Sequence, residues 1–272
     1  MASLISDRWG YWTEEYGPAA WPDLFPAGQG KRQSPIDIRK PDVKFDESLA
    51  KTPFKFDYKS KDFLLIRNSG VSFQVDCPDK SSSTFSAAHL NNEVYLLRQF
   101  HGHWGTNSKN GSEHLVEGVG YAAELHMVHW NSKYSTFAES INHGDGIAVL
   151  GIFLHESQED NPALNPIINS VSTILHKGER KPFEKNFDLA SIYPDTSAFW
   201  TYEGSLTTPP LNECVIWTVF KESIPISSNQ LLKLRQVNYT TKEESGKSPT
   251  KMIDNVRPPQ AMNGRVVRAS FR

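Results

Sequence analysis

Three histidines in two neighbouring segments have the type and spacing to bind a metal ion. His101 and His103 stand two residues apart in a strand-like run, and His126 lies in the next such run. Because successive side chains of a strand alternate between its faces, the first two imidazoles point the same way. Three neutral imidazoles that converge on one point form an open zinc site, and the remaining position takes a water that becomes a nucleophile once ionised.

Two further side chains are spaced to support these histidines. Gln99 shares the strand parity of His101, and Glu124 shares that of His126. A metal-bound imidazole usually donates its other N–H to an acceptor, and both side chains carry acceptor oxygens. His129 is three residues from His126, so it points to the other face of the strand and we expect it to be a buried structural histidine.

These side chains must be positioned by strands. Apolar and aromatic residues dominate six strand-like runs: Phe63–Ile66, Ser72–Asp76, Tyr95–His103, Ala122–Trp130, Ala148–Leu154 and Val215–Phe220. Two segments predict helices, Pro166–His176 and Ser227–Val237, the second beginning with a capping box. A sheet with few, peripheral helices is an α+β arrangement. Because no linker, repeat or low-complexity tract interrupts the chain, we expect a single domain over residues 1–272.

Composition excludes several classes of partner. The net charge is -2 and no basic stripe is present, which argues against nucleic acid. No apolar run is long enough to cross a membrane. Met1–Arg8 lacks the apolar region of a signal peptide, and the C-terminus carries no retention or lipidation signal. The N-glycosylation patterns at Asn110 and Asn238 are therefore interpreted as chance matches.

A series of ordered motifs covers nearly the whole chain, from Trp9 to Phe271. The motifs are WGY, RQSPIDI, QFHGHWG, GSEH, YAAELHMVHW, AVLGIFL, SLTTPPL and DNVRPPQ. Together they resemble the alpha-class carbonic anhydrases of the cytosolic type. The resemblance implies a Zn²⁺ enzyme, a lyase that hydrates carbon dioxide reversibly to bicarbonate and a proton. It also implies a large, twisted, mostly antiparallel central sheet of about ten strands, with short peripheral helices and a conical cavity that has zinc at its base.

The same resemblance assigns roles to residues of the site. His101, His103 and His126 match the zinc ligands, and the backbone carbonyl of Asn255 would hold His103. Thr207 would accept a hydrogen bond from the hydroxide nucleophile and donate its own proton to Glu113, because a carboxylate only accepts. His114 is expected to be a structural hydrogen-bonding residue.

Carbon dioxide is apolar, so its pocket must be an apolar wall beside the nucleophile. By resemblance Val128, Val149, Leu206 and Trp217 form this wall, and Thr208 contacts bicarbonate. Each of these four apolar side chains could equally belong to an ordinary hydrophobic core.

The chain departs from the family pattern at three places. Val71 stands where fast members carry a proton-shuttle histidine, so proton transfer is expected to limit turnover, with Tyr11 and Ser69 helping to order a water chain. Gly102 replaces a larger residue between two ligands. Arg98 and Asn212 are expected near the cavity rim, where apolar residues are common.

The expected partners are carbon dioxide, bicarbonate and water, with sulfonamide and anion inhibitors implied by the resemblance. The expected state is a monomer. Secreted members commonly join an N-terminal cysteine to one just after the TTPP motif, but here Leu211 takes that later position and no cysteine precedes Cys77. With Cys214 in an apolar run as a free thiol, these features indicate a reducing, cytoplasmic compartment.

Two alternatives remain. A catalytically inactive carbonic-anhydrase-related binding module would typically lack one of the zinc-binding histidines, and all three are present. A structural zinc site would normally have four protein ligands, often with cysteine, and neither cysteine lies near the histidines in sequence.

Overall fold

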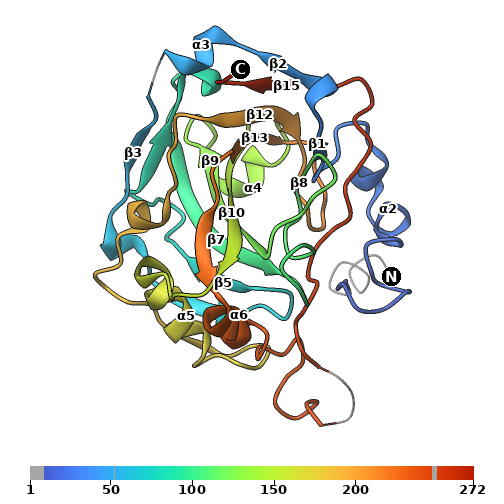
Figure 1. The fold of residues 1–272 in the computed structure, drawn as a ribbon, viewed down its shortest axis with the longest axis vertical. Coiled ribbons are helices and arrows are strands. Elements are labelled where there is room, and N and C mark those ends of the chain that lie inside the picture. Colours follow the sequence, from blue (N-terminus) through green and yellow to red (C-terminus); the bar gives the residue numbers. More distant parts are fainter. Residues whose placement is uncertain (1–8, 52, 247–249) are drawn as a thin grey trace.

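The computed structural model describes residues 9–51, 53–246 and 250–272 (Figure 1). One mixed sheet of 13 strands runs through them, and a two-stranded sheet of β1 (Asp37–Ile38) and β8 (Leu115–Val116) accompanies it. The N-terminal segment judged to lack a signal peptide lies outside the described residues.

The long strands at the centre of the sheet are β7 (Tyr95–Trp104), β9 (Ala123–Asn131) and β10 (Ile147–Ser157), which lie side by side in Figure 1. The main path through the sheet runs in the order β11-β4-β5-β7-β9-β10-β13-β12-β15-β2. Its other members are β11 (Arg180–Pro182), β4 (Leu65–Asn68), β5 (Phe73–Asp76), β13 (Val215–Phe220), β12 (Phe199–Gly204), β15 (Val267–Ala269) and β2 (Val43–Phe45).

Three short strands pair beside the main path, namely β3 (Lys55–Asp57), β6 (Thr84–Ser86) and β14 (Ile224–Ser227). The expected strand count of about ten therefore covers the main path and misses these three. Most neighbours are antiparallel, as predicted, while β10 runs parallel to β13 and β14, and β15 runs parallel to β2. The α+β class with a large, mostly antiparallel central sheet is confirmed.

Apolar residues cover both faces of the central strands. Every residue of β9 is buried, including the polar residues Glu124, His126, His129 and Asn131, so the polar side chains of this strand need partners within the protein. One cluster packs the sheet against the helices, as at Ile167 and Leu231. A second cluster on the other side includes Val149 and Trp217. The histidine-bearing strands are therefore fixed from both sides.

The helices are short, and Figure 1 shows α2, α3, α5 and α6 around the outside of the sheet. They are α2 (Trp21–Leu24), α3 (Glu47–Ala50), α4 (Phe137–Ser140), α5 (Asn165–Val171) and α6 (Ser228–Leu234). The predicted capping box precedes α6, with Ser227 and Gln230 bonding each other's backbone N–H. Across the described ranges, no helix combines the length and apolar content that a membrane crossing requires.

Both predicted helices extend too far in the sequence-based assignment. In α5 the hydroxyl of Ser172 donates to the carbonyl of Ile168, and the next amides bond three residues back, which tightens and ends the helix. In the same way, the amide of Val237 bonds the carbonyl of Leu234 after the end of α6.

Candidate metal centre

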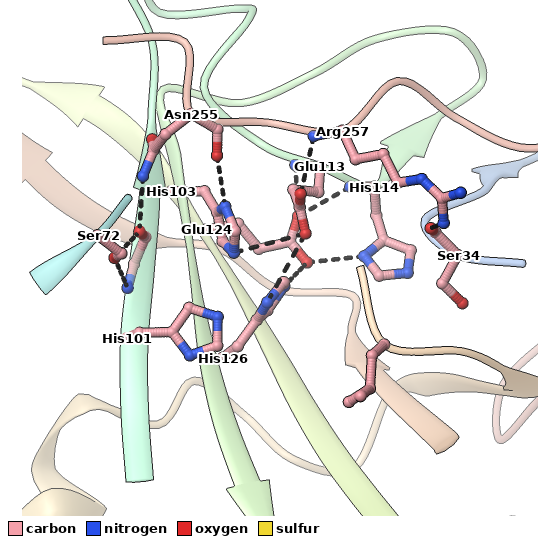
Figure 2. A network of polar contacts seen from close by, with 12 residues as sticks. Ser34, Ser72, His101, His103, Glu113, His114, Glu124, His126, Asn255 and Arg257 are labelled. Carbon is pink, nitrogen blue, oxygen red and sulfur yellow. Dashed lines mark hydrogen bonds and ion pairs between the residues drawn. The ribbon is translucent and has the colours of Figure 1, made fainter. Parts of the chain in front are cut away.

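The structure brings His101, His103 and His126 together on two neighbouring strands (Figure 2). His101 and His126 face each other directly across the β7–β9 ladder, and His103 follows on the same face of β7. One nitrogen from each ring lies within 4.8 Å of the others. His103 and His126 are buried, whereas His101 is partly exposed. The cluster is therefore enclosed by protein on one side and open on the side of His101.

The second nitrogen of each ring has an acceptor. His101 Nδ1 lies 2.9 Å from Gln99 Oε1, and His126 Nε2 lies 2.7 Å from Glu124 Oε1. His103 Nδ1 lies 2.7 Å from the backbone oxygen of Asn255, a residue far away in sequence. With these N–H groups donating outward, the other nitrogen of each ring carries a lone pair toward the cluster.

One orphaned nitrogen supports a metal at this place. His103 Nε2 is buried and has no hydrogen-bond partner among the described residues. A buried polar atom without a partner is costly, and a cation bound there would remove that cost. Three imidazoles with open nitrogens are the donor set of a catalytic zinc site, so the residues present fit zinc.

Burial keeps the rings of His101 and His103 neutral. Burial lowers the pKa of His101 well below its ordinary value, and the neighbouring His103 and His126 lower it further. Burial also lowers the pKa of His103, although Glu113 opposes that shift. A histidine must be neutral to ligate a metal, so both rings are ready to bind without first losing a proton.

Glu124 accepts the hydrogen bonds that connect the polar network next to the histidine cluster (Figure 2). Its Oε1 accepts from His126 and from His114 Nδ1, both at 2.7 Å, and its Oε2 accepts the backbone N–H groups of Glu113 and His114 at 2.9 Å. Burial disfavours the charged carboxylate, but His114 and His126 outweigh it, and the pKa of Glu124 lies well below its ordinary value. A fully charged acceptor therefore fixes the tautomer of His126.

The remaining histidines in this region are structural in their contacts. His114 Nε2 lies 2.6 Å from the Tyr202 hydroxyl, so both of its ring nitrogens face protein groups. His129 lies on the other face of β9, with Nε2 3.0 Å from the Tyr58 hydroxyl. Burial lowers the pKa of His129 to about 3.

Glu113 lies next to the histidine cluster, but no hydrogen bond within the described residues joins it to Thr207. Glu113 Oε1 accepts the backbone N–H of Arg257 at 2.8 Å. Glu113 Oε2 is buried without a hydrogen-bond partner in the described part of the chain and lies 3.4 Å from His103 Nε2. Thr207 is buried in the loop after β12, and no hydrogen bond between the described residues joins it to Glu113. This bond remains an expectation for the metal-loaded protein.

An apolar row lies beside the histidines. Val149 on β10 pairs with Val128 on β9 and with Trp217 on β13, so the three side chains are neighbours across three strands. The Trp217 ring is centred 4.8 Å from the His126 ring. Leu206 is partly buried against the apolar cluster that contains these three side chains, and Thr208 is partly exposed in the same loop.

Val71 lines a cavity of about 360 Å³ together with Trp9, Ser69 and Lys177, and its carbonyl accepts a hydrogen bond from the Asn255 side chain at 2.8 Å. Ser69 donates its hydroxyl proton to the backbone oxygen of Ser72 at 2.8 Å and accepts the Val71 N–H. Burial and the nearby Glu113 charge raise the pKa of Tyr11 well above its ordinary value, so this phenol stays neutral.

The two rim candidates are held by contacts of their own. Arg98 donates to the Cys77 carbonyl at 2.8 Å and lies 3.3 Å from Asp79, with its guanidinium 5.9 Å from the Phe137 ring. Asn212 donates to the Ile141 carbonyl at 2.9 Å.

Sequence reasoning missed Ser72 and the side chain of Arg257. The buried Arg257 guanidinium donates to Gln33 Oε1 and the Ser34 carbonyl, so it fixes the segment whose N–H holds Glu113. Its place within the DNVRPPQ motif was the available signal. Ser72 carried none, because a serine between a turn and a strand is unremarkable in sequence.

Comparison with known proteins gives one consistent family. A family model described as eukaryotic-type carbonic anhydrase matches residues 16–271. A protein named carbonic anhydrase 3 from Homo sapiens is 41% identical over 268 residues, which cover 98% of this chain and 100% of the relative. The proteins of the same name from Sus scrofa and Bos taurus are each 40% identical over the same length and coverage.

Proposed function

Because this chain belongs to the eukaryotic-type carbonic anhydrase family, we propose that it catalyses the reversible hydration of carbon dioxide to bicarbonate and a proton. Members of this family are zinc-dependent lyases, and the histidine cluster fits that cofactor. The observation that carries the proposal is the convergence of three open imidazole nitrogens within 4.8 Å, each ring fixed from behind by an acceptor.

His101 and His103 would hold the zinc through Nε2, and His126 through Nδ1, because their other nitrogens face Gln99, Asn255 and Glu124. When bound, zinc acts as a Lewis acid that lowers the pKa of a water molecule and so supplies a hydroxide nucleophile at neutral pH. The protein must then aim this nucleophile, provide a place for carbon dioxide and remove a proton.

Thr207 and Glu113 would aim the nucleophile. The free oxygen of Glu113 faces the histidine cluster and has no other donor within the described ranges. We propose that it accepts the Thr207 hydroxyl proton when metal is bound. Since a hydroxyl has one proton, Thr207 then offers only a lone pair to the nucleophile, which must itself donate. This arrangement favours hydroxide over anions that carry no proton.

The row of Val128, Val149 and Trp217 would receive carbon dioxide. These side chains present apolar surface next to His126, and Leu206 extends it from the loop. Carbon dioxide has no strong hydrogen-bonding group, so a dry apolar wall positions it without competing for the nucleophile. Thr208, partly exposed in the loop that follows Leu206, would contact bicarbonate.

Of these three tasks, proton removal has the least support from the side chains of the site. The Val71 side chain has no titratable group, and Tyr11 stays neutral, so neither relays a proton as a base near neutral pH. We propose that ordered water in the cavity beside Ser69 passes the proton to solvent buffer and that this transfer limits turnover.

A cytoplasmic location fits the covalent features of the chain. Cys77 and Cys214 are both free and buried, as expected for a reducing compartment. Asn238, in one of the glycosylation patterns, is buried and donates to the Leu175 carbonyl, so a glycan there would break the local structure.

The test combines metal analysis with a carbon dioxide hydration assay. We expect one zinc per chain, loss of hydration after chelation and recovery when zinc is returned. A zinc-loaded protein that hydrates carbon dioxide no faster than buffer would favour the inactive binding module.

A further inference from the structure

The residue between the two ligands of β7 is a glycine, and the packing around it requires one. A Cβ at Gly102 would lie 2.7 Å from Cε1 and 3.0 Å from Cζ of Phe73. The buried Phe73 ring thus occupies the space that a side chain at this position would need. A glycine inside a strand has more backbone freedom to lose than any other residue, so the segment that joins His101 to His103 is intrinsically the least constrained part of the strand.

The ladder between β7 and β9 continues past Gly102, which pairs with Leu125, but the ladder on the other edge of β7 stops. The pairing of β5 with β7 ends at Gln74 and His101, one residue before Gly102. Without a continued ladder, the peptide groups of Gly102 on this edge need other partners, because they are buried.

Ser72 supplies those partners with its side chain (Figure 2). Its Oγ lies 2.5 Å from the Gly102 carbonyl oxygen and 3.2 Å from the Gly102 nitrogen. The single hydroxyl proton has two carbonyl acceptors within reach, Gly102 O at 2.5 Å and Phe73 O at 2.8 Å, and the Gly102 oxygen is the nearer. A lone pair of the same Ser72 oxygen accepts the Gly102 N–H, so this oxygen contacts both backbone groups of Gly102. Ser72 is itself buried. If its hydroxyl were removed, a water molecule could not take over these hydrogen bonds without a substantial cost in free energy.

Asn255 completes the fixation. Its side-chain nitrogen donates to the Val71 carbonyl at 2.8 Å and lies 3.3 Å from the Gly102 carbonyl oxygen. Its backbone oxygen accepts from His103, and its side-chain oxygen accepts the Trp104 N–H. The turn that carries Val71 and Ser72 is therefore tied to the ligand strand at Gly102, between the two histidines.

We propose that Ser72 is a positioning residue for the metal centre. Its hydroxyl fixes the Gly102 peptide and so holds the imidazoles of His101 and His103 in the spacing that zinc requires. The proposal rests on the proposed function, since it assumes that these histidines bind zinc. Without the hydroxyl, the two imidazoles of the metal-free site can adopt more arrangements. Zinc binding must then restrict more of them, so zinc affinity falls and zinc release becomes faster.

The test compares Ser72→Ala with two matched variants. Ser72→Thr keeps the hydroxyl. Ser140→Ala removes a different buried serine, whose Oγ donates to the Phe137 carbonyl at 2.7 Å in α4. Zinc release into a chelator is timed for each protein, and hydrogen exchange of the Gly102 amide is measured by NMR on the metal-free forms.

We expect Ser72→Ala to release zinc about tenfold faster, in the range typical for partners behind a metal ligand, and to exchange the Gly102 amide faster. Ser72→Thr should stay near the wild-type rates. Ser140→Ala should lose thermal stability without changing either rate. If Ser72→Ala does not fold, Ser72→Cys gives the same comparison with a weaker donor and a smaller expected change.

Wild-type zinc release from Ser72→Ala, with Gly102 exchange unchanged, would overturn the proposal. So would faster release in Ser140→Ala of the same size, since that would show a general effect of stability. A wild-type protein that binds no zinc would instead refute the proposed function. The exchange rates of the Gly102 amide would still test whether the Ser72 hydroxyl fixes the Gly102 peptide.

Discussion

Replacing Glu124 by glutamine removes one negative charge while keeping the size of the side chain, and the structure predicts a large effect. The carboxylate accepts four hydrogen bonds, two at each oxygen. An amide has only one oxygen. If that oxygen keeps the two backbone N–H groups, the NH₂ group faces His114 Nδ1 and His126 Nε2, both of which donate.

The cost follows from the two donors left without an acceptor. Each buried donor that loses its partner costs about 1–3 kcal/mol, so the metal-free Glu124→Gln protein should lose about 3 kcal/mol of unfolding free energy. His126 can avoid the conflict by moving its proton from Nε2 to Nδ1. Because Nδ1 is the nitrogen open to the cluster, zinc affinity should fall about 10- to 100-fold.

The assay is competition for zinc against a chelator, together with urea unfolding of the metal-free protein. Glu156→Gln is the matched control: it makes the same chemical change at an exposed residue of β10, whose carboxylate accepts from Ser228. The control should change the unfolding free energy by no more than about 0.5 kcal/mol. The reasoning is refuted if Glu124→Gln binds zinc within twofold of wild type and unfolds at the same urea concentration.

Three further predictions concern the nucleophile, the proton and acid stability. Thr207→Ala should retain zinc but hydrate carbon dioxide about 10- to 100-fold more slowly, from the loss of one positioned hydrogen bond of about 1–3 kcal/mol; unchanged stopped-flow rates at full zinc occupancy would contradict its role. Val71→His should raise turnover in dilute buffer, and imidazole-type buffer should raise wild-type turnover to a plateau; a wild type already fast in dilute buffer would show another proton path. His129 has a pKa of about 3 when folded against 6.5 as its ordinary value. Below pH 6.5 the unfolded chain binds a proton at His129 that the folded chain does not bind, so this side chain should lower the unfolding free energy by about 2.5 kcal/mol between pH 7 and pH 4.5. Other buried histidines with lowered pKa values add to the total drop, so the His129 share is measured as the difference in this drop between wild type and His129→Gln in urea unfolding.

Local periodicity explains which features of the site were predictable. The alternation of side chains along a strand places His101 and His103 on one face and pairs Gln99 with His101, and the structure has that arrangement. The same rule sends His129 to the opposite face. These inferences need only residues within one strand.

Sequence periodicity could not predict contacts between segments that are far apart in the chain. Asn255 reached the site only through the family resemblance, because nothing local links it to His103. Ser72 was missed because its role arises where the β5–β7 ladder stops, and a sequence does not show where pairing ends. Strands as short as β3 and β6 have too few residues to display alternation, so neither is among the six strand-like runs found from the sequence, and the expected count of about ten strands came from the family resemblance.

We propose that His101, His103 and His126 hold a zinc ion that the hydration of carbon dioxide requires. The most direct test measures zinc content and carbon dioxide hydration on the same preparations of wild type and His101→Ala, with circular dichroism to check folding. We expect one zinc per chain and an active wild type, and a folded variant that loses zinc affinity and activity together. A folded, zinc-depleted His101→Ala protein with wild-type hydration would contradict it.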